Sequence, residues 1–252
     1  MPYNHAKQGL KMQEKTRCIV LRTVKYGDRS LIIDLLTREY GRVSVIWRVP
    51  KLGKGGVRRQ YFQPLSILEV NYDRRSATSL PQLKEARIAE PYVTLHYDTV
   101  KLCVSFFIAE FLCLATRSEQ YNPYLYDFVE NSLVWYDASN VASANFHLMF
   151  MIRVSKFLGF YPNVDDYADG DFFDLRAGLF THYPPTHKDF LGSEEARNIR
   201  NLMRMSASNM HLFRFSRVQR NNVIEVLLRF YTLHIPDFHA LKSWDVLREV
   251  FD

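Results

Sequence analysis

The sequence predicts an α+β protein of more than one domain, in which a small five-stranded antiparallel barrel precedes an all-α helical domain. Two observations lead to this prediction. Residues 16–92 read as five short segments rich in β-branched and aromatic residues, separated by turns. After Pro91, apolar residues recur at helical spacing in long segments. Because 47% of the 252 residues are hydrophobic and 14% are aromatic, the chain can bury a sizeable core.

The barrel strands are predicted from β-branched runs and from the turn residues between them. We predict strands over residues 16–24, 31–37, 42–49, 61–73 and 80–92. In the third strand Val43, Val45 and Trp47 occupy alternate positions, which is the pattern of a half-buried strand. Gly41 can take the positive φ that the preceding turn needs. Pro64 indicates an edge or a bulge in the fourth strand.

The helical domain is predicted from amphipathic segments. We predict helices over residues 95–117, 122–137, 144–160, 193–206 and 215–235. Residues 162–192 break this rhythm with Gly, Pro and Asp, so we expect a long irregular insert there. The expected organisation is a mobile leader over residues 1–15, a barrel domain over residues 16–92 and a helical domain over residues 93–252.

Positive charge is confined to the first third of the chain. The formal net charge is +6, but residues 1–80 hold 16 Lys and Arg against 6 Asp and Glu, a net +10. Residues 81–252 hold 17 Lys and Arg against 21 Asp and Glu, a net −4. This asymmetry is typical of a protein in which one module meets a polyanion.

The segment WRVPKLGKGGVRRQYF, residues 47–62, is the strongest functional signal. It contains five cations, no acid and three glycines, with aromatic residues at both ends. Lys and Arg supply the mobile and forked cations that backbone phosphates need, and glycine lets a loop adjust to a nucleic-acid strand. We expect DNA to bind through these cations and rings together with cations of the neighbouring strands, namely Arg17, Arg22, Lys25, Arg29, Arg42, Arg48, Lys51, Lys54, Arg58, Arg59, Trp47 and Tyr61.

Each of these assignments has a structural alternative. The cations can belong to an ordinary solvated face of the barrel. Trp47 alternates with Val43 and Val45, so its ring can pack in the core instead of facing a base. Phe62 and Tyr61 have the same alternative.

Catalytic and metal-binding patterns are missing from the sequence. It contains no GxSxG, GxxxxGK[ST], HExxH or CxxC, so we expect neither an enzyme nor a cofactor. Residues 165–176 match a calcium loop at Asp165, Asp169 and Gly170, but Tyr167 and Arg176 stand where oxygen ligands are needed. Three cysteines without a disulfide framework, no membrane-spanning run and no secretory signal favour a reduced cytoplasmic protein with no membrane partner.

The chain resembles the RecO family of bacterial recombination mediators. The resemblance rests on IVLRTVKYGDRS, LLTREYGRVS and QPLSILEV in the first third, on FLGFYP at residues 157–162, and on FYTLHIPDFHALKSWDVLREVF at the end. It covers nearly the whole chain from about Cys18. It implies an oligonucleotide/oligosaccharide-binding (OB) barrel followed by a helical domain, located in the cytoplasm with the nucleoid.

The same resemblance implies a function and a set of partners. Members bind single- and double-stranded DNA, anneal complementary strands and act with RecR, single-strand-binding protein and, indirectly, RecA. Many members carry a four-cysteine zinc module after the LGxxP segment, but this chain has no cysteine there. We therefore do not expect zinc, and we expect the insert to be held by packing of Phe172, Phe173, Leu175 and Phe180.

The helical domain is expected to bind a protein partner. Single-strand-binding protein ends in an acidic, apolar tail, and its receptor needs an apolar groove with a cation at the rim. Arg153 and Lys156 lie between Met151 and Phe157 on an apolar segment and are our candidates, with ordinary surface residues of a packed helix as the alternative. Two other classes of protein also fit the residues: an OB-fold RNA-binding factor, and a protein-interaction adaptor with a basic face.

Overall fold

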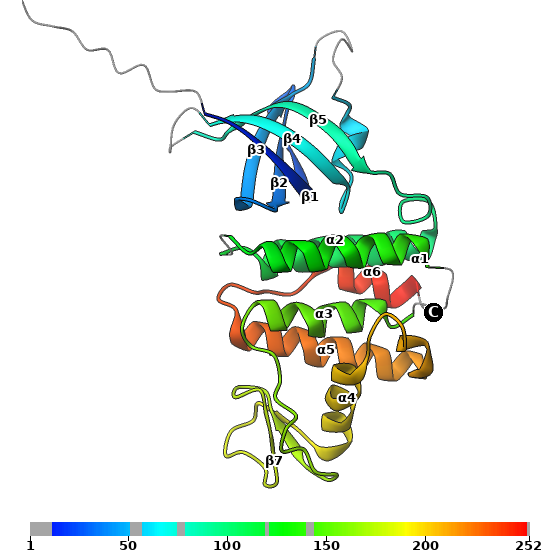
Figure 1. The fold of residues 1–252 in the computed structure, drawn as a ribbon. Helices are drawn as coiled ribbons and strands as arrows, with labels where there is room; N and C mark the ends of the chain where they lie inside the picture. Colours follow the sequence, from blue (N-terminus) through cyan, green and yellow to red (C-terminus); the bar gives the residue numbers. More distant parts are fainter. Residues whose placement is uncertain (1–11, 51–56, 75–78, 119–120, 140–143, 251–252) are drawn as a thin grey trace, which may run out of the picture. The chain divides into compact units, whose positions relative to one another are not determined.

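The protein folds into two compact units (Figure 1). This computed structural model describes residues 12–50, 57–74, 79–118, 121–139 and 144–250. The first unit comprises the described chain up to Pro91 together with Thr116–Tyr126, and the second comprises Tyr92–Ala115 together with the chain from Asp127. Within the described residues, no helix combines the length and the apolar character that a membrane span requires.

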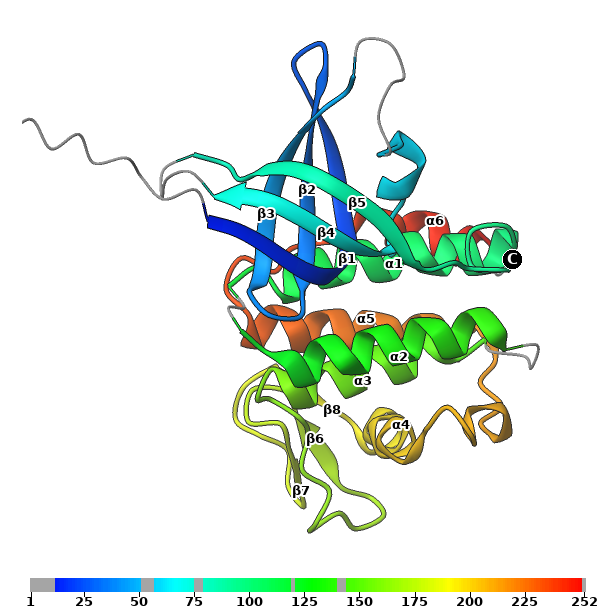
Figure 2. The same ribbon diagram turned by 45° about the horizontal axis from the view of Figure 1, so that its top comes forward.

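The first unit contains a closed barrel with the strand order β1-β2-β3-β5-β4 (Figures 1 and 2). Its strands are β1 (Met12–Tyr26), β2 (Ser30–Thr37), β3 (Gly41–Arg48), β4 (Ile67–Arg74) and β5 (Gln82–Glu90). Neighbouring strands are antiparallel except β3 and β5, which pair in parallel. A five-stranded Greek-key barrel of this kind is the OB fold, so the predicted fold is confirmed.

Strand β1 is long enough to pair along both of its edges. Its first half, from Met12 to Ile19, pairs with β4, and its second half, from Cys18 to Tyr26, pairs with β2. The register shifts by one residue between Val20 and Arg22, and such a bulge bends a strand. The expectation of a leader that extends to residue 15 was wrong, because residues 12–15 already pair with β4; residues 1–11 lie outside the described part of the chain.

The interior of the barrel is filled by apolar side chains from every strand. The core consists of Cys18, Val20, Leu31, Ile33, Leu35, Val43, Val45, Trp47, Phe62, Leu68, Val70, Tyr72, Leu83 and Ala86. Trp47 is 5% exposed, and its ring centroid lies 5.1 Å from that of Phe62. Gly41 has φ of 66°, as the turn before β3 requires.

The fourth strand begins later than predicted. Residues Arg59–Phe62 form a short 3-10 helix, η1, and β4 starts only at Ile67. Pro64 has no N–H to donate to a ladder, and Leu65 takes a positive φ of 65°, so the chain turns before pairing begins. The backbone N–H of Leu65 donates to the carbonyl of Val20, which fixes this turn against β1.

The second unit is a set of packed helices. They are α1 (Thr99–Ala115), α2 (Pro123–Ala138), of which the residues before Asp127 belong to the first unit, α3 (Phe146–Phe157), α4 (Ser193–Arg204), η2 (Met210–Leu212), α5 (Arg217–His234) and α6 (Lys242–Val250). Aromatic rings fill the space between them: Phe111 of α1 lies 4.8 Å from Tyr231 of α5, centroid to centroid. Helix α6 was not predicted; Leu241, Trp244 and Leu247 are buried at helical spacing.

The insert is more regular than expected. Strands β6 (Phe172–Asp174), β7 (Leu179–Thr181) and β8 (Phe190–Leu191) form a small sheet in the order β7-β6-β8. The predicted packing of its aromatic residues is confirmed, because Phe173 and Leu175 are buried and the ring centroids of Phe173 and Phe180 are 4.9 Å apart.

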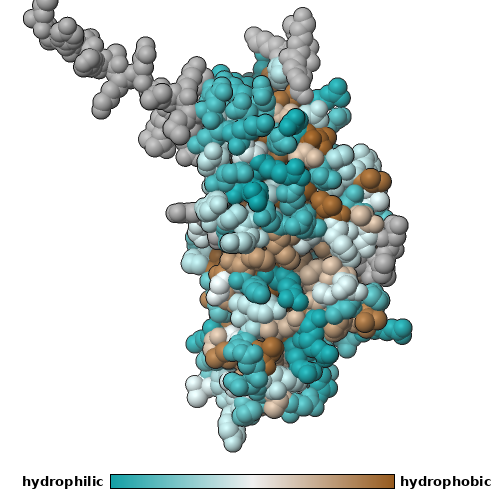
Figure 3. All heavy atoms as spheres, in the orientation of Figure 1, coloured by the Kyte–Doolittle hydropathy of each residue, from teal (hydrophilic) through white to brown (hydrophobic). Residues whose placement is uncertain are grey.

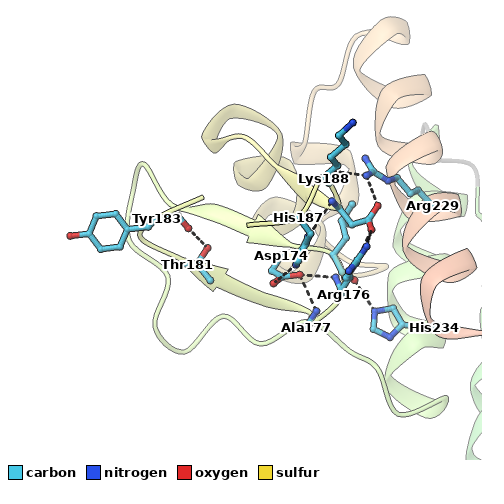
Figure 4. Close-up of polar contacts among 11 residues, drawn as sticks. Asp174, Arg176, Ala177, Thr181, Tyr183, His187, Lys188, Arg229 and His234 are labelled. Atoms are coloured by element: carbon cyan, nitrogen blue, oxygen red, sulfur yellow. Dashed lines mark hydrogen bonds and ion pairs between the residues drawn. The ribbon is translucent and has the colours of Figure 1, made fainter. Parts of the chain in front are cut away.

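Polar contacts tie the insert to α5 (Figure 4). The carboxylate of Asp189 accepts hydrogen bonds from Arg176 at 2.7 Å and from Arg229 of α5 at 2.6 Å. These hydrogen bonds lower the pKa of Asp189. His234, also on α5, lies 2.9 Å from the carbonyl of Leu175. The residues present do not fit a thiolate zinc module, and the described insert is held by carboxylate–guanidinium contacts and aromatic packing instead.

A histidine buried in α3 makes the stability of the protein dependent on pH. Burial and the nearby charge of Arg220 lower the pKa of His147 to about 3, from an ordinary value of 6.5. The unfolded chain therefore binds a proton that the folded protein excludes, and stability falls as the pH drops from about 6.5 towards 3. Between pH 7.5 and pH 5, urea unfolding of the unmodified protein should lose about 2 kcal/mol more than that of His147→Gln. Equal losses in the two proteins would contradict this assignment.

Candidate nucleic-acid interface

Two groups can be distinguished among the candidate cations of the barrel and their neighbours. One group pairs with carboxylates on neighbouring strands, and the other has no acidic partner within the described residues. This division follows from strand register, because residues opposite each other on adjacent strands share a face of the sheet. The sequence prediction treated all of these cations alike.

Asp34 is the centre of the first paired cluster. It lies on β2 opposite Arg22 of β1 and Ser44 of β3. Its Oδ2 lies 2.8 Å from a guanidinium nitrogen of Arg22 and 3.3 Å from one of Arg42, and the Ser44 hydroxyl donates to Oδ1. Burial raises the pKa of Asp34, but the Ser44 hydrogen bond and the two arginine charges outweigh it, so the pKa lies below its ordinary value.

A second paired cluster involves β1, β4 and β5. Arg17 lies 3.6 Å from a carboxylate oxygen of Glu90, and Lys15 lies 3.8 Å from one of Glu69. Arg87 donates to the same Glu69 carboxylate from Nε at 3.1 Å. These cations are already neutralised in part, so a polyanion would have to compete with the carboxylates.

Five cations that have no acidic partner among the described residues lie at one end of the barrel. We call this set the basic end; it consists of Lys25, Arg29, Arg48, Arg58 and Arg59, all of them exposed. Arg48 ends β3 opposite Ser30, and the N–H of Val49 donates to the carbonyl of Arg29 at 2.8 Å, so the turn between β1 and β2 lies beside the end of β3 (Figure 2).

The short helix η1 belongs to the same region. Thr23 donates to the carbonyl of Phe62 at 3.0 Å, which holds η1 against β1. Arg58 and Arg59 lie at the start of this helix. Lys51 and Lys54 lie outside the described residues. OB barrels bind oligonucleotides at the face of strands 2 and 3 and at the loops between strands 1 and 2 and between strands 4 and 5. Lys25 and Arg29 lie at the turn between β1 and β2, and Arg48 ends β3, whereas Arg58 and Arg59 lie in the connection from β3 to β4.

Both aromatic candidates contact the barrel core. Trp47 faces the barrel interior, so the expectation that its ring meets a base was wrong; alternate residues of β3 point inward, and Trp47 shares the side of Val43 and Val45. Tyr61 is half-buried and packs against the core. The exposed ring in this region is Tyr26, at 58% exposure, which the prediction missed although the turn KYGDRS contains it.

The two partner-binding candidates lie in different surroundings. Arg153 donates to the carbonyls of Met203 at 3.2 Å and Met205 at 2.8 Å, and so connects α3 to the end of α4. Lys156 is exposed on α3. Close to this contact is a pocket of about 310 Å³, lined by Tyr161, Val164, Tyr167, Arg200, Met203 and Arg204.

Removing the Asp34 charge should destabilise the barrel. Asp34→Asn keeps the size of the side chain but leaves Arg22 and Arg42 close together without their carboxylate, at a cost of about 1–3 kcal/mol at pH 7. Because the folded pKa is depressed, the carboxylate stabilises the protein above the unfolded pKa near 4, and this contribution is lost as the pH falls below it. Urea unfolding at pH 7 and pH 3.5 checks both statements. Equal stability of the two proteins at pH 7 would contradict the first.

Comparison with known proteins agrees with this architecture. The family model described as Recombination protein O N terminal matches residues 12–92, and the model described as Recombination protein O C terminal matches residues 96–245. The first match coincides with the barrel, and the second covers most of the helical unit and the insert.

Curated relatives match along nearly the whole chain. DNA repair protein RecO of Phocaeicola vulgatus is 45% identical over 240 residues, which cover 95% of this chain and all 100% of that protein. DNA repair protein RecO of Bacteroides fragilis is 42% identical over 242 residues, with 96% and 100% covered. The protein of the same name from Flavobacterium johnsoniae is 33% identical over 241 residues, with 95% and 100% covered. This chain therefore belongs to the RecO family.

Proposed function

We propose that this protein is a non-catalytic DNA-binding protein of recombinational DNA repair, which binds single- and double-stranded DNA at the basic end of its barrel. The observation that carries the proposal is the set of five exposed cations without an acidic partner in the described residues, of which Lys25 and Arg29 lie at the β1–β2 turn and Arg48 at the end of β3, where OB barrels bind oligonucleotides. Membership of the RecO family supports it, because the relatives are named as DNA repair proteins.

The proposed activity is the annealing of complementary strands. Two DNA strands repel each other, and cations that neutralise both backbones lower that barrier without any acid or base chemistry. Each phosphate contact also releases condensed counterions, so binding should weaken steeply as salt rises. Arg17, Arg22 and Arg42 contribute less in this proposal, because each already lies near a carboxylate.

The family resemblance extends the proposal to other proteins. We propose that the protein acts on DNA coated by single-strand-binding protein, together with RecR, and that it helps to load the RecA recombinase. The helical unit is the proposed contact for the acidic, apolar tail of single-strand-binding protein. The pocket beside α4 supports this, because apolar and aromatic side chains line it together with Arg200 and Arg204.

The cations considered for tail binding differ in the contacts that they already make. Arg200 lies over the ring of Tyr167, 4.7 Å from its centroid. Arg204 is exposed at the end of α4. Arg153 holds two backbone carbonyls, so its proposed role is to position α4, whereas Lys156 and Arg204 are the cations proposed to meet the carboxylates of the tail.

Neutralising the basic end should weaken DNA binding and flatten its salt dependence. For Arg29→Ala/Arg48→Ala, the slope of log affinity against log salt should fall by about 0.7 for each lost contact with a single strand. Fluorescence titration at several salt concentrations measures this, and the rate of annealing of complementary strands coated by single-strand-binding protein should fall with it.

The matched control removes the same charge elsewhere on the barrel. Lys15→Ala/Arg87→Ala removes two cations that pair with Glu69. This control should keep most of the affinity and slope. The same loss in both double variants would mean that only net charge matters and would remove the basic end from the site. Tighter binding to structured RNA than to single-stranded DNA would favour an RNA-binding factor, and weak binding to both at physiological salt would favour an adaptor.

Tail binding should depend on Arg204, which lines the pocket, and on Lys156, which is exposed on α3. Lys156→Ala/Arg204→Ala should weaken binding of a labelled acidic, apolar peptide several-fold in fluorescence polarisation, because two exposed cations proposed to meet the tail carboxylates are lost. Arg214→Ala, at an exposed cation between η2 and α5, is the control and should leave binding unchanged. Unchanged affinity in the double variant would exclude this pocket as the tail site.

A further inference from the structure

The outer face of the barrel carries two rows of side chains beside the basic end. Tyr26 of β1, Ser30 of β2 and Arg48 of β3 lie directly opposite one another and form the first row. Cross-strand partners share a face, with their Cα atoms about 4.5–5.5 Å apart, so the row is continuous.

The second row is apolar. It consists of Val24, Ile32 and Ile46, which are again direct cross-strand partners. Val24 is 42% exposed, and Ile32 and Ile46 are half-buried. The N–H of Ile46 donates to the carbonyl of Pro81, which brings the start of β5 beside this row.

Apolar side chains on the outside of this barrel need an explanation. Tyr26 is 58% exposed, and Val49 and Leu80, which flank the rows, are 38% and 44% exposed. The barrel surface seen in Figure 3 is mostly hydrophilic, with small hydrophobic areas between the polar side chains. Tyr26, Val49 and Leu80 are not members of the barrel core, which contains Trp47 and Phe62, so core packing does not account for them.

The charges around the rows indicate what binds them. Arg48 is a member of the first row and Arg29 lies in the turn that follows Tyr26, and Asp28 is the acid in that same turn. A surface with more cations than acids attracts a polyanion. An exposed aromatic ring beside such cations suits a ligand that has both phosphates and flat apolar faces. An unpaired nucleic-acid strand has both, whereas an acidic protein surface presents no planar bases.

We propose that Tyr26 is a stacking platform for an unpaired base, and that it makes the basic end discriminate single-stranded from double-stranded DNA. This inference rests on the proposed DNA-binding function and deepens it. The cations contact phosphates, which both forms of DNA present. The ring contacts a base face, which a duplex hides inside its stack and a single strand exposes. The apolar row next to Tyr26 then accommodates the neighbouring base or sugar.

The test compares Tyr26→Ser with Tyr26→Phe on two probes, a labelled oligothymidylate and a blunt duplex of the same length. Tyr26→Ser should weaken binding to the single strand by about 5- to 150-fold and leave the duplex affinity and both salt slopes unchanged. Tyr26→Phe keeps the ring and should bind as the unmodified protein does. Because the side chain is exposed, urea unfolding curves of all three proteins should coincide.

A matched control separates the ring at this position from exposed tyrosines in general. Tyr183→Ser removes a ring that is 82% exposed in the insert (Figure 4) and should change neither affinity. Equal losses on both probes, no loss on the single strand, or a Tyr26→Phe variant as weak as Tyr26→Ser would each overturn the stacking role while DNA binding itself stands. Failure of the unmodified protein to bind either probe would instead refute the proposed function, and the stacking inference with it.

Discussion

Closure of the barrel by β1 is the constraint on which the rest of this unit depends. Its 15 residues pair with β4 over the first half and with β2 over the second, and the bulge between Val20 and Arg22 lets one strand serve both neighbours. Closure removes the free strand edges that would otherwise invite aggregation. It also fixes the turn after Tyr26 beside the end of β3, where Arg29 and Arg48 come together.

The same register decides which cations are available to a ligand. Asp34 sits between β1 and β3, so it holds Arg22 and Arg42, while the rows nearer the turn contain no carboxylate opposite a cation. A net charge of +10 over the first 80 residues therefore overstates the charge offered at any one place. A surface cation that already pairs with a carboxylate adds little to the affinity for a phosphate backbone. The cations of the basic end have no acidic partner among the described residues, so they should contribute most to that affinity.

The insert shows how a small sheet can be held by contacts with a neighbouring helix. Three very short strands cannot bury enough surface to be stable alone. Phe173 packs 6.0 Å from Phe230 of α5, centroid to centroid, and Asp189 joins Arg176 in the insert to Arg229 on the same helix. Helix α5 thus provides both an apolar and an ionic anchor. The acidic residues in this region serve as hydrogen-bond acceptors for turns, as Asp174 does for the N–H groups of Arg176 and Ala177.

The sequence by itself determined the order and type of the main elements, the position of Gly41 in a turn and the family, because hydrophobic periodicity and turn residues act locally. It missed α6, which is only nine residues long, and it placed the start of β4 too early, because Pro64 and Leu65 act through a backbone turn. Only the tertiary structure decided that Trp47 points inward, that Arg22 and Arg42 share Asp34, and that Tyr26 lies in line with Arg48. These outcomes depend on strand register, and register is set by pairing between residues far apart in the chain.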